Sequence, residues 1–371
     1  MIAILGHASI VKGQIFEAPV NTLVETLVNH KTDFIHVRHS IDGQIPSTVY
    51  MYKSGEISGE KQLKIISKVS ILRYISEIFL TYRYFAQRKD AKEIVFIGAD
   101  PLNAVSGVLL KKMGKIKKAI FYTVDYTETR FGDKMLNWCY QRIDRYCINN
   151  ADEVWNVSSR IFLLRKKLGV SEKKNLYVPN MPSEDYKPHV KNKRDKFTLI
   201  TLGILGEQLD FNNLFEAMKS LEVKFPELKL RIAGDGPKRQ ELEKEVKRLG
   251  LAKKVEFLGY ISHDQALEAI SKSGIGLALY NGNWSFNYYG DSMKCREFFC
   301  FGLPVMTTDT HSTADDIREN KTGEVVRMDA KSYEAGLEKI FSNYNELSKN
   351  SLELSKKYDD IHWQMMKGFV K

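Results

Sequence analysis

The first half of the chain consists of short apolar runs separated by segments in which apolar residues recur at helical spacing. Short apolar runs indicate buried strands, and apolar positions three or four apart indicate helices. The predicted strands are residues 2–5, 34–37, 93–97, 118–123 and 153–157, and the clearest predicted helices are 20–28 and 61–88. Because strands that alternate with helices fold as a parallel sheet with right-handed crossovers, we expect an α/β domain here.

A second alternating series follows a break in the pattern. Two prolines, Pro179 and Pro182, precede the polar and basic stretch 187–196, which we interpret as a linker. The series then restarts with predicted strands 197–202, 228–233, 255–258, 275–280 and 305–308, and with predicted helices 212–221, 237–250 and 293–301. Ser262 and Gln265 have the spacing of a capping box and predict a further helix start.

The chain has 371 residues, which is too long for one compact α/β core. The two series therefore predict two Rossmann-like domains, over residues 1–185 and 195–350. The last segment, 352–371, is expected to be helical. Two domains of this kind favour a protein with a ligand-binding cleft.

Composition favours a cytoplasmic protein. The first residues carry no basic leader, so secretion is not expected. No run approaches the roughly 18 to 20 apolar residues that a spanning helix needs, so any membrane contact is expected to be peripheral. The four cysteines lack the spacing of a zinc site or of a disulfide framework: Cys139, Cys147, Cys295 and Cys300.

The net charge of +10 is concentrated in the first half of the chain. Residues 1–190 hold 28 basic and 19 acidic residues, whereas residues 191–371 hold 28 and 27. This asymmetry indicates an anionic partner for the first half, such as phospholipid head groups, a polyprenyl-diphosphate carrier or nucleic acid. A lysine-rich surface that only maintains solubility is the alternative.

Two turns between a strand and a helix in the second half are rich in glycine. They are residues 203–206 and 234–237. Glycine lets the backbone approach a ligand closely, and a helix start offers free N–H groups to a phosphate. A tight turn without any ligand explains either turn equally well. The motif G-x-G-x-x-G is absent, which disfavours a nicotinamide or flavin enzyme.

The helix predicted over 293–301 carries the strongest candidate site. Asp291 or Ser292 can cap it, and Lys294 and Glu297 then lie three residues apart on one face. An ammonium suits a diphosphate, and a carboxylate suits the two vicinal hydroxyls of a ribose. The alternative is an exposed ion pair between these two side chains, worth about 0.3 kcal/mol.

Residues 201–326 resemble the donor domain of GT-B glycosyltransferases of family 4 and related bacterial exopolysaccharide enzymes. The resemblance rests on the segments 203–206, 230–237 and 255–260, and on Lys294-x-x-Glu297 leading into 302–305. Residues 151–158 are similar to the end of the acceptor domain of that family. The resemblance implies a GT-B architecture, with two Rossmann-like domains facing each other across a cleft and a C-terminal helix, about 352–371, that crosses back onto the first domain.

The resemblance also assigns a donor site. It implies that Gly206, Gly236 and Tyr260 line the nucleotide, that Lys294 meets the diphosphate and that Glu297 holds the ribose. Gly234, Ser292 and Met293 lie in the same segments and complete the predicted donor-binding set. Many relatives carry a basic pair after the first strand of this domain, but this chain has Ile204 and Glu207 there, so Lys294 is expected to meet the phosphate charge.

Asp125 is the candidate catalytic residue. It follows the predicted strand 118–123, and carboxyl ends of strands are where α/β sheets gather ligands. It resembles the aspartate base of inverting GT-B enzymes, which deprotonates an acceptor hydroxyl; a role in turn formation or capping is the alternative. Glu128 and Arg130 are close enough in sequence to share an acceptor site, to which Gly13 and Gln14 of the first loop also belong.

No metal or cofactor is expected. The chain lacks a D-x-D motif, and the spacing of His36 and His39 places them on opposite faces of a strand. The expected donor is a nucleotide sugar, UDP- or GDP-linked, which is a substrate and not a cofactor.

Residues 61–88 and 109–118 interleave basic with apolar side chains and are the candidate contacts with an anionic membrane. A helix that packs its apolar stripe on the sheet has the same pattern. Nucleic acid is not expected as a partner, because no motif of a known binding module occurs. If the membrane contact exists, the inner face of the cell membrane is the expected location.

We therefore expect a metal-independent glycosyltransferase that moves a sugar to a glycan or lipid-linked acceptor in cell-surface glycan synthesis. One alternative is a nucleotide-sugar 2-epimerase, which needs no acceptor. The other is a non-catalytic, transferase-like binding subunit.

Overall fold

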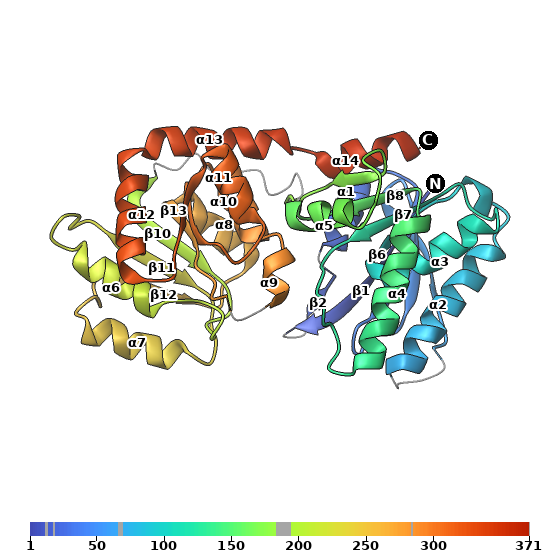
Figure 1. Ribbon diagram of the computed structural model, residues 1–371, viewed down its shortest axis with the longest axis horizontal. Helices are drawn as coiled ribbons and strands as arrows, with labels where there is room; N and C mark the ends of the chain where they lie inside the picture. The colour runs from blue at the N-terminus through green and yellow to red at the C-terminus, as the bar shows by residue number, and fades with distance from the viewer. Residues whose placement is uncertain (12–13, 18, 66–69, 183–193, 283–284, 371) are drawn as a thin grey trace. The chain divides into compact units, whose positions relative to one another are not determined.

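The computed structural model describes residues 1–370 apart from 12–13, 18, 66–69, 183–193 and 283–284. The chain forms two compact units (Figure 1). The first contains residues 1–179 and 360–371, and the second contains residues 180–359.

The first unit is built on a mixed sheet with the order β5-β4-β3-β1-β6-β7-β8-β9. Its parallel strands are β1 (Ile2–Val11), β3 (Phe34–Ser40), β6 (Val95–Ala99), β7 (Lys118–Thr123), β8 (Glu153–Asn156) and β9 (Asn175–Tyr177). The antiparallel strands are β2 (Gln14–Phe16), β4 (Thr48–Lys53) and β5 (Glu56–Gln62). The strand order reverses between β1 and β6, and ligands of α/β sheets bind at such a switch point.

The helices of this unit are α1 (Val20–Asn29), α2 (Ser70–Ala86), the 3-10 helix η1 (Ala91–Glu93), α3 (Asp100–Lys112), α4 (Lys134–Asn150) and α5 (Ser159–Lys167). Helices α2, α3 and α4 lie side by side (Figure 1). The side chains of Asp133 and Ser158 accept the N-terminal hydrogen bonds of α4 and α5.

The second unit has a sheet of six parallel strands in the order β12-β11-β10-β13-β14-β15. These strands are β10 (Asp195–Leu202), β11 (Lys229–Ala233), β12 (Val255–Gly259), β13 (Ser273–Ala278), β14 (Val305–Thr308) and β15 (Gly323–Val326). The order reverses between β10 and β13, which places the switch point of this unit at the ends of those two strands.

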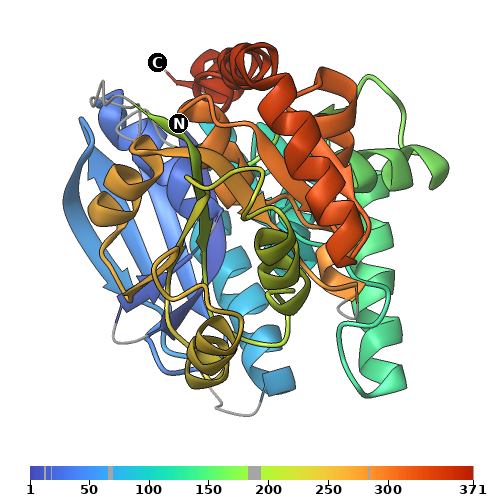
Figure 2. The ribbon, with the colours of Figure 1, turned by 90° about the vertical axis from the view of Figure 1, so that its left-hand side faces the viewer.

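Helices cover both faces of this second sheet (Figure 2). One face is covered by α6 (Asn212–Ser220), α7 (Arg239–Arg248) and α12 (Ala330–Ser342). The other is covered by α8 (His263–Ser271), α10 (Met293–Cys300), α11 (Thr313–Asn320) and α13 (Tyr344–Lys357), and a short helix, α9 (Ser285–Tyr289), precedes α10. The predicted capping box at the start of α8 is present. The α/β fold predicted from the hydrophobic pattern is confirmed in both units.

Two predicted helices are shorter in the structure. In the described part of the segment 61–88, residues 61 and 62 belong to the edge strand β5, and helix α2 covers Ser70–Ala86. The segment 352–371 is interrupted at residues 358–360: helix α13 ends at Lys357, and Asp360, whose φ of 57° is left-handed, directly precedes the next helix. Residues 352–357 belong to α13 and pack on the second unit, where Leu354 lies in the core.

Only the last residues return to the first unit. Helix α14 (Ile361–Met366), followed by the 3-10 helix η3 (Lys367–Phe369), packs on α1. The ring of Trp363 stacks on that of His30, with the two centroids 3.8 Å apart. The predicted boundaries, 1–185 with 352–371 and 195–350, differ from those of the compact units by 6 to 15 residues.

Candidate functional site

The turns that follow β10, β11 and β12 are joined to one another through their backbones. The amide of Gly203 donates to the carbonyl of Ala233 at 2.9 Å, and the amide of Gly234 donates to the carbonyl of Gly259 at 2.7 Å. Together the turns form a hydrogen-bonded backbone layer at the carboxyl edge of the second sheet.

Glycine is required in this layer because the turns touch. Gly234 has a φ of 138°, and a Cβ atom built on it would lie 1.8 Å from the carbonyl oxygen of Gly203. A Cβ atom on Gly236 would lie 2.4 Å from the carbonyl oxygen of Leu205. Packing alone therefore explains Gly234 and Gly236. At Gly206 the obstructing atom belongs to the flexible side chain of Gln208, so space is less decisive there.

Lys294 lies at the switch point between β10 and β13. Its Nζ atom is 2.5 Å from the place where a Cβ atom of Gly203 would be, and 5.4 Å from the ring centroid of Tyr280. Gly203 follows β10 and Tyr280 follows β13, so the ammonium lies over the ends of both strands. Within the described residues, no carboxylate lies within ion-pair distance of Lys294. The site thus presents a cation next to glycine backbone, a suitable arrangement for a phosphate.

Glu297 is one helical turn after Lys294, as predicted. Its Oε1 atom lies 3.1 Å from Nε2 of His263, and its side chain is 14% exposed. His263 is the first residue of α8, directly after the N-cap Ser262. Sequence reasoning found the capping box but did not assign His263 to the site. The contact holds the carboxylate of Glu297 at the surface between α8 and α10.

The start of α10 is held by a buried ion-pair network and not by a capping side chain. Ser292 occupies the N-cap position, but its side chain makes no capping hydrogen bond. Asp291 instead pairs with Arg296, whose Nη2 atom lies 2.8 Å from Oδ1, and Arg296 also pairs with Asp316. Burial raises the pKa of Asp291, although Arg296 opposes this effect.

Further hydrogen bonds connect this network to its surroundings. The hydroxyl of Thr313 donates to Asp291 at 2.8 Å, and the amide of Asn180 donates to the same carboxylate at 2.9 Å. The amide of Ser292 donates to the hydroxyl of Thr313 at 2.8 Å. Lys294 therefore projects from a helix whose first turn is fixed by buried partners.

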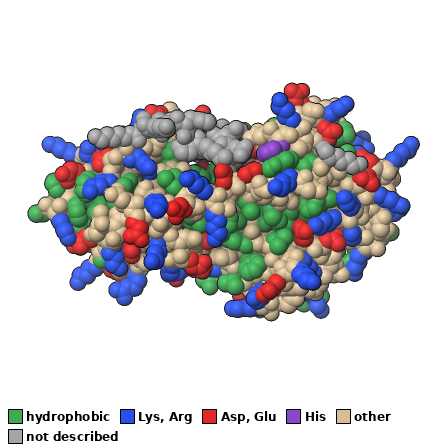
Figure 3. Space-filling model, turned by 90° about the horizontal axis from the view of Figure 1, so that it is seen from above, with side chains coloured by type: hydrophobic (Ala, Val, Ile, Leu, Met, Phe, Trp, Pro, Cys, Tyr) green, Lys and Arg blue, Asp and Glu red, His purple; other side chains and the backbone are tan. Residues whose placement is uncertain are grey.

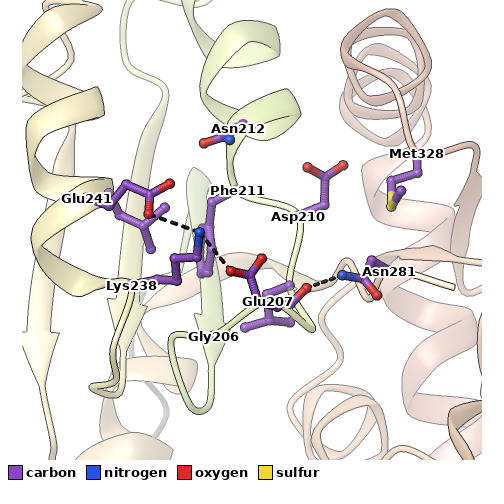
Figure 4. A pocket seen from close by; sticks show the side chains of 11 residues that line it. Gly206, Glu207, Asp210, Phe211, Asn212, Lys238, Glu241, Asn281 and Met328 are labelled. Atoms are coloured by element: carbon purple, nitrogen blue, oxygen red, sulfur yellow. Dashed lines mark hydrogen bonds and ion pairs between the residues drawn. The ribbon is translucent and has the colours of Figure 1, made fainter. Parts of the chain in front are cut away.

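A cavity of about 190 Å³ lies beside the Gly206 turn (Figure 4). It is lined by Gly206, Glu207, Leu209, Asp210, Phe211, Asn212, Lys238, Glu241, Leu242, Asn281 and Met328. The Nζ atom of Lys238 lies 2.9 Å from carboxylate oxygens of both Glu207 and Glu241. Lys238 is therefore paired with two carboxylates, whereas Lys294 has no carboxylate partner among the described residues.

The remaining donor-site candidates lie at the same edge of the sheet. Tyr260 directly follows β12 and is 60% exposed. Met293 is the first residue of α10 and is partly buried. The structure thus brings Gly203 and Lys294 into contact and places Tyr260 and Met293 after β12 and at the start of α10.

In the first unit, Asp125 and Arg130 lie together after β7. The Nη1 atom of Arg130 is 2.7 Å from Oδ1 of Asp125, whose side chain is 49% exposed. The guanidinium of Arg130 also lies over the ring of Tyr140, at 5.3 Å from its centroid. The side chain of Glu128 is exposed, and its backbone carbonyl accepts a hydrogen bond from Asn137 at 2.8 Å. Gly13 lies outside the described residues, and for Gln14 only the backbone, in β2, is described.

A buried polar cluster at the switch point of the first unit was not predicted. His7 lies in β1. Its Nε2 atom is 3.1 Å from Oε2 of Glu77, and its Nδ1 atom is 3.1 Å from Oδ2 of Asp100. Burial lowers the pKa of His7, but the two carboxylates outweigh it and raise the value to about 9. Asp100 has a left-handed φ of 63° and also accepts a hydrogen bond from the amide of Leu102. The three residues are far apart in sequence, so no local pattern indicates the cluster.

Neither a metal site nor a spanning helix is found in the part of the chain that the structure describes. Its described His, Cys, Asp and Glu side chains form no group of three or more that could hold a metal ion. The helices of that part are also too short or too polar to cross a bilayer.

The second unit matches a known family. Residues 182–357 match the family described as glycosyl transferases group 1. The chain is also 21% identical over 256 residues to the putative glycosyltransferase EpsD of Bacillus subtilis. That match covers 64% of this chain and 65% of the relative, which is less than two thirds of the length of the relative.

Solved structures are similar over almost the whole chain. HepE of Anabaena, crystallised in complex with UDP, has a TM-score of 0.65 at 11% identity, with 99% of this chain and 98% of that chain covered. WaaG, a glycosyltransferase involved in lipopolysaccharide biosynthesis, has a TM-score of 0.64 at 14% identity, with 100% and 98% covered. Residues 182–357 are therefore similar to the group 1 glycosyl transferases, and the chain has the GT-B fold of two Rossmann-like units that its sequence predicts.

Proposed function

We propose that this chain transfers a sugar from a nucleoside diphosphate to a hydroxyl of a glycan or lipid-linked acceptor. The observation that carries the proposal is the ammonium of Lys294, which lies over the Gly203 turn without a carboxylate partner among the described residues. The group 1 domain and the likeness to a structure crystallised with UDP support it. UDP or GDP is the proposed nucleotide, and cell-surface glycan synthesis is the proposed setting.

In this proposal the second unit holds the donor. Lys294 neutralises the diphosphate as it leaves, which stabilises the charge that develops during transfer. Glu297 accepts hydrogen bonds from the ribose hydroxyls, and His263 orients its carboxylate from α8. A lysine can supply this stabilisation without a metal, so we propose a metal-independent reaction.

Asp125 is the proposed base. A carboxylate accepts the proton of an acceptor hydroxyl as that oxygen attacks the sugar, which leads to inversion. The side chain is half exposed, so a hydroxyl can reach it, and the ion pair with Arg130 holds it in place. Glu128 and Arg130, with Gly13 and Gln14, remain the proposed acceptor contacts.

We also propose that the first unit binds peripherally to the anionic inner face of the cell membrane. Helix α2 turns large apolar side chains outward: Ile71, Leu72, Ile75 and Phe79, each 45–57% exposed. Met113, just after α3, is 60% exposed and follows Lys111 and Lys112. Apolar side chains with nearby lysines suit an anionic lipid surface. On the face that Figure 3 shows, basic and acidic side chains are interspersed with one another and with hydrophobic side chains.

The deciding experiment is product analysis with a panel of UDP, GDP, dTDP and ADP sugars, with and without a lipid-linked glycan extract. Acceptor-dependent release of the nucleoside diphosphate, with a lengthened glycan, is expected. Release of nucleotide and an altered hexose without acceptor would establish the epimerase. Binding of nucleotide without any product would establish the non-catalytic subunit.

A further inference from the structure

Helix α2 exposes large apolar side chains and buries mainly polar ones. Most of the side chains that it buries against the unit are polar: Arg73, Ser76, Glu77 and Thr81, each at most 6% exposed. Phe85, near the end of the helix, is buried as well. Its exposed positions include the four large apolar residues named above. Burying a charged group costs free energy unless the group is paired or hydrogen-bonded. The burial of Arg73 and Glu77 on the inner face of α2 therefore needs an explanation.

A cavity of about 430 Å³ lies beside this inner face. The turn after β3, from Ser40 to Ser47, forms one wall, and Leu63 and Ile65 after β5 form an apolar wall. Arg73 and Glu77 of α2 complete the lining. The volume lies within the range of small-molecule pockets.

Arg73 and Glu77 each have one buried polar atom without a hydrogen-bond partner among the described residues. These atoms are Nε of Arg73 and Oε1 of Glu77, which lie 3.8 Å apart. The other oxygen of Glu77 contacts His7 at 3.1 Å, and Nη2 of Arg73 donates to the carbonyl of Ile41 at 2.5 Å. The Nε and Oε1 atoms form an ion pair with each other, so Arg73 and Glu77 line the cavity as a paired guanidinium and carboxylate.

Gly43 allows this arrangement. It has a φ of 79°, and a Cβ atom built on it would lie 3.1 Å from Nη1 of Arg73. A side chain at this position would crowd the guanidinium and strain the turn. The turn after β3, the guanidinium of Arg73 and the carboxylate of Glu77 thus form one continuous polar wall of the cavity.

We propose that this cavity binds a sugar residue. A hydroxyl is both donor and acceptor, so a polyol matches Arg73 and Glu77 together. A phosphate or carboxylate would be repelled by Glu77 and by Asp42 on the turn beside Arg73. The apolar wall of Leu63 and Ile65 suits the C–H face of a sugar ring. We identify this sugar as part of the acceptor glycan, and this identification rests on the proposed function.

Saturation-transfer NMR of the full chain tests the proposal with glucose, galactose, N-acetylglucosamine and lactose. Ile65→Trp fills the cavity from its apolar wall, and Ile57→Trp is the control at an exposed position of β5 outside the lining. We expect at least a fivefold loss of sugar signal in Ile65→Trp and none in Ile57→Trp. UDP affinity, measured by calorimetry, is expected to stay within twofold in both variants.

Gln44→Trp provides a second blocking variant at the exposed rim of the cavity, in case Ile65→Trp does not fold. The same loss of sugar signal is expected. Absence of signal in the wild type, equal signal in a folded blocked variant, or displacement of the sugar by inorganic phosphate would each overturn the proposal. Failure to bind UDP with intact sugar binding would instead contradict the proposed function alone.

Discussion

At the scale of single residues, the two lysines at the carboxyl edge of the second sheet differ in their partners. Lys294 has no carboxylate partner among the described residues, whereas Lys238 is neutralised by Glu207 and Glu241. A hydrogen bond to a charged group contributes about 1.5 to 3 kcal/mol, so Lys294→Ala should weaken UDP binding by roughly 10-fold to 100-fold. Calorimetry with UDP measures the change.

Lys238→Ala is the matched control for that measurement. It removes the same charge from the same edge of the sheet, and we expect less than a threefold change in UDP affinity. Equal losses in both variants would show that general electrostatic attraction, and not the position of Lys294 over Gly203, holds the phosphate.

His7 predicts a pH-dependent stability of the first unit. Its pKa is raised to about 9 by Asp100 and Glu77, with His39 and Tyr74 also packed against its ring. Because the folded pKa exceeds the unfolded value of about 6.5, the contribution of about 3 kcal/mol is complete below pH 6.5 and is lost as pH rises through 9. In urea unfolding, the stability difference between wild type and His7→Gln should shrink from pH 6 to 9.5. A constant difference would show that His7 is not protonated in the folded state.

At the scale of elements, α10 depends on Arg296. Arg296→Leu leaves Asp291 and Asp316 buried without their cation, and such a loss costs about 3 to 5 kcal/mol. Arg318→Leu is the control, because Arg318 also pairs with two aspartates, Asp309 and Asp315, but is 45% exposed. Its cost should be below about 1 kcal/mol. Denaturant unfolding compares the two variants, and similar costs would contradict the role of burial.

Sequence patterns predict the elements of this protein where their residues are buried on a regular period. Strands β6 and β13 are entirely buried, so their apolar runs are clear. Strand β5 is mostly exposed and polar, so it has no apolar pattern, and the predicted helix 61–88 includes its last two residues. Likewise, helical spacing places Lys294 and Glu297 on one face, but the position of Lys294 over Gly203 depends on β10 lying next to β13. Local periodicity contains no information about such neighbours.

The outward apolar residues of α2 predict membrane binding by this helix. The double variant Ile75→Glu with Phe79→Glu should abolish flotation with anionic liposomes at low salt, because it places charge where the apolar side chains would enter the interface. Ile57→Glu is the control, because Ile57 is 57% exposed, as Ile75 is, but lies on β5. Flotation of the double variant at the wild-type level would reject α2 as the contact.

At the scale of the whole molecule, the separation into two units predicts that UDP stabilises only part of the chain. The proposed donor site draws its residues from 180–359, so a ligand that binds there protects that unit from opening. At a UDP concentration 100 times its Kd, the gain is about 2.7 kcal/mol. Hydrogen exchange should therefore slow in β10, β13 and α10 when UDP is added and stay unchanged in β1 and β3. Lys294→Ala should remove most of this protection, and protection confined to the first unit would place the nucleotide on the other sheet.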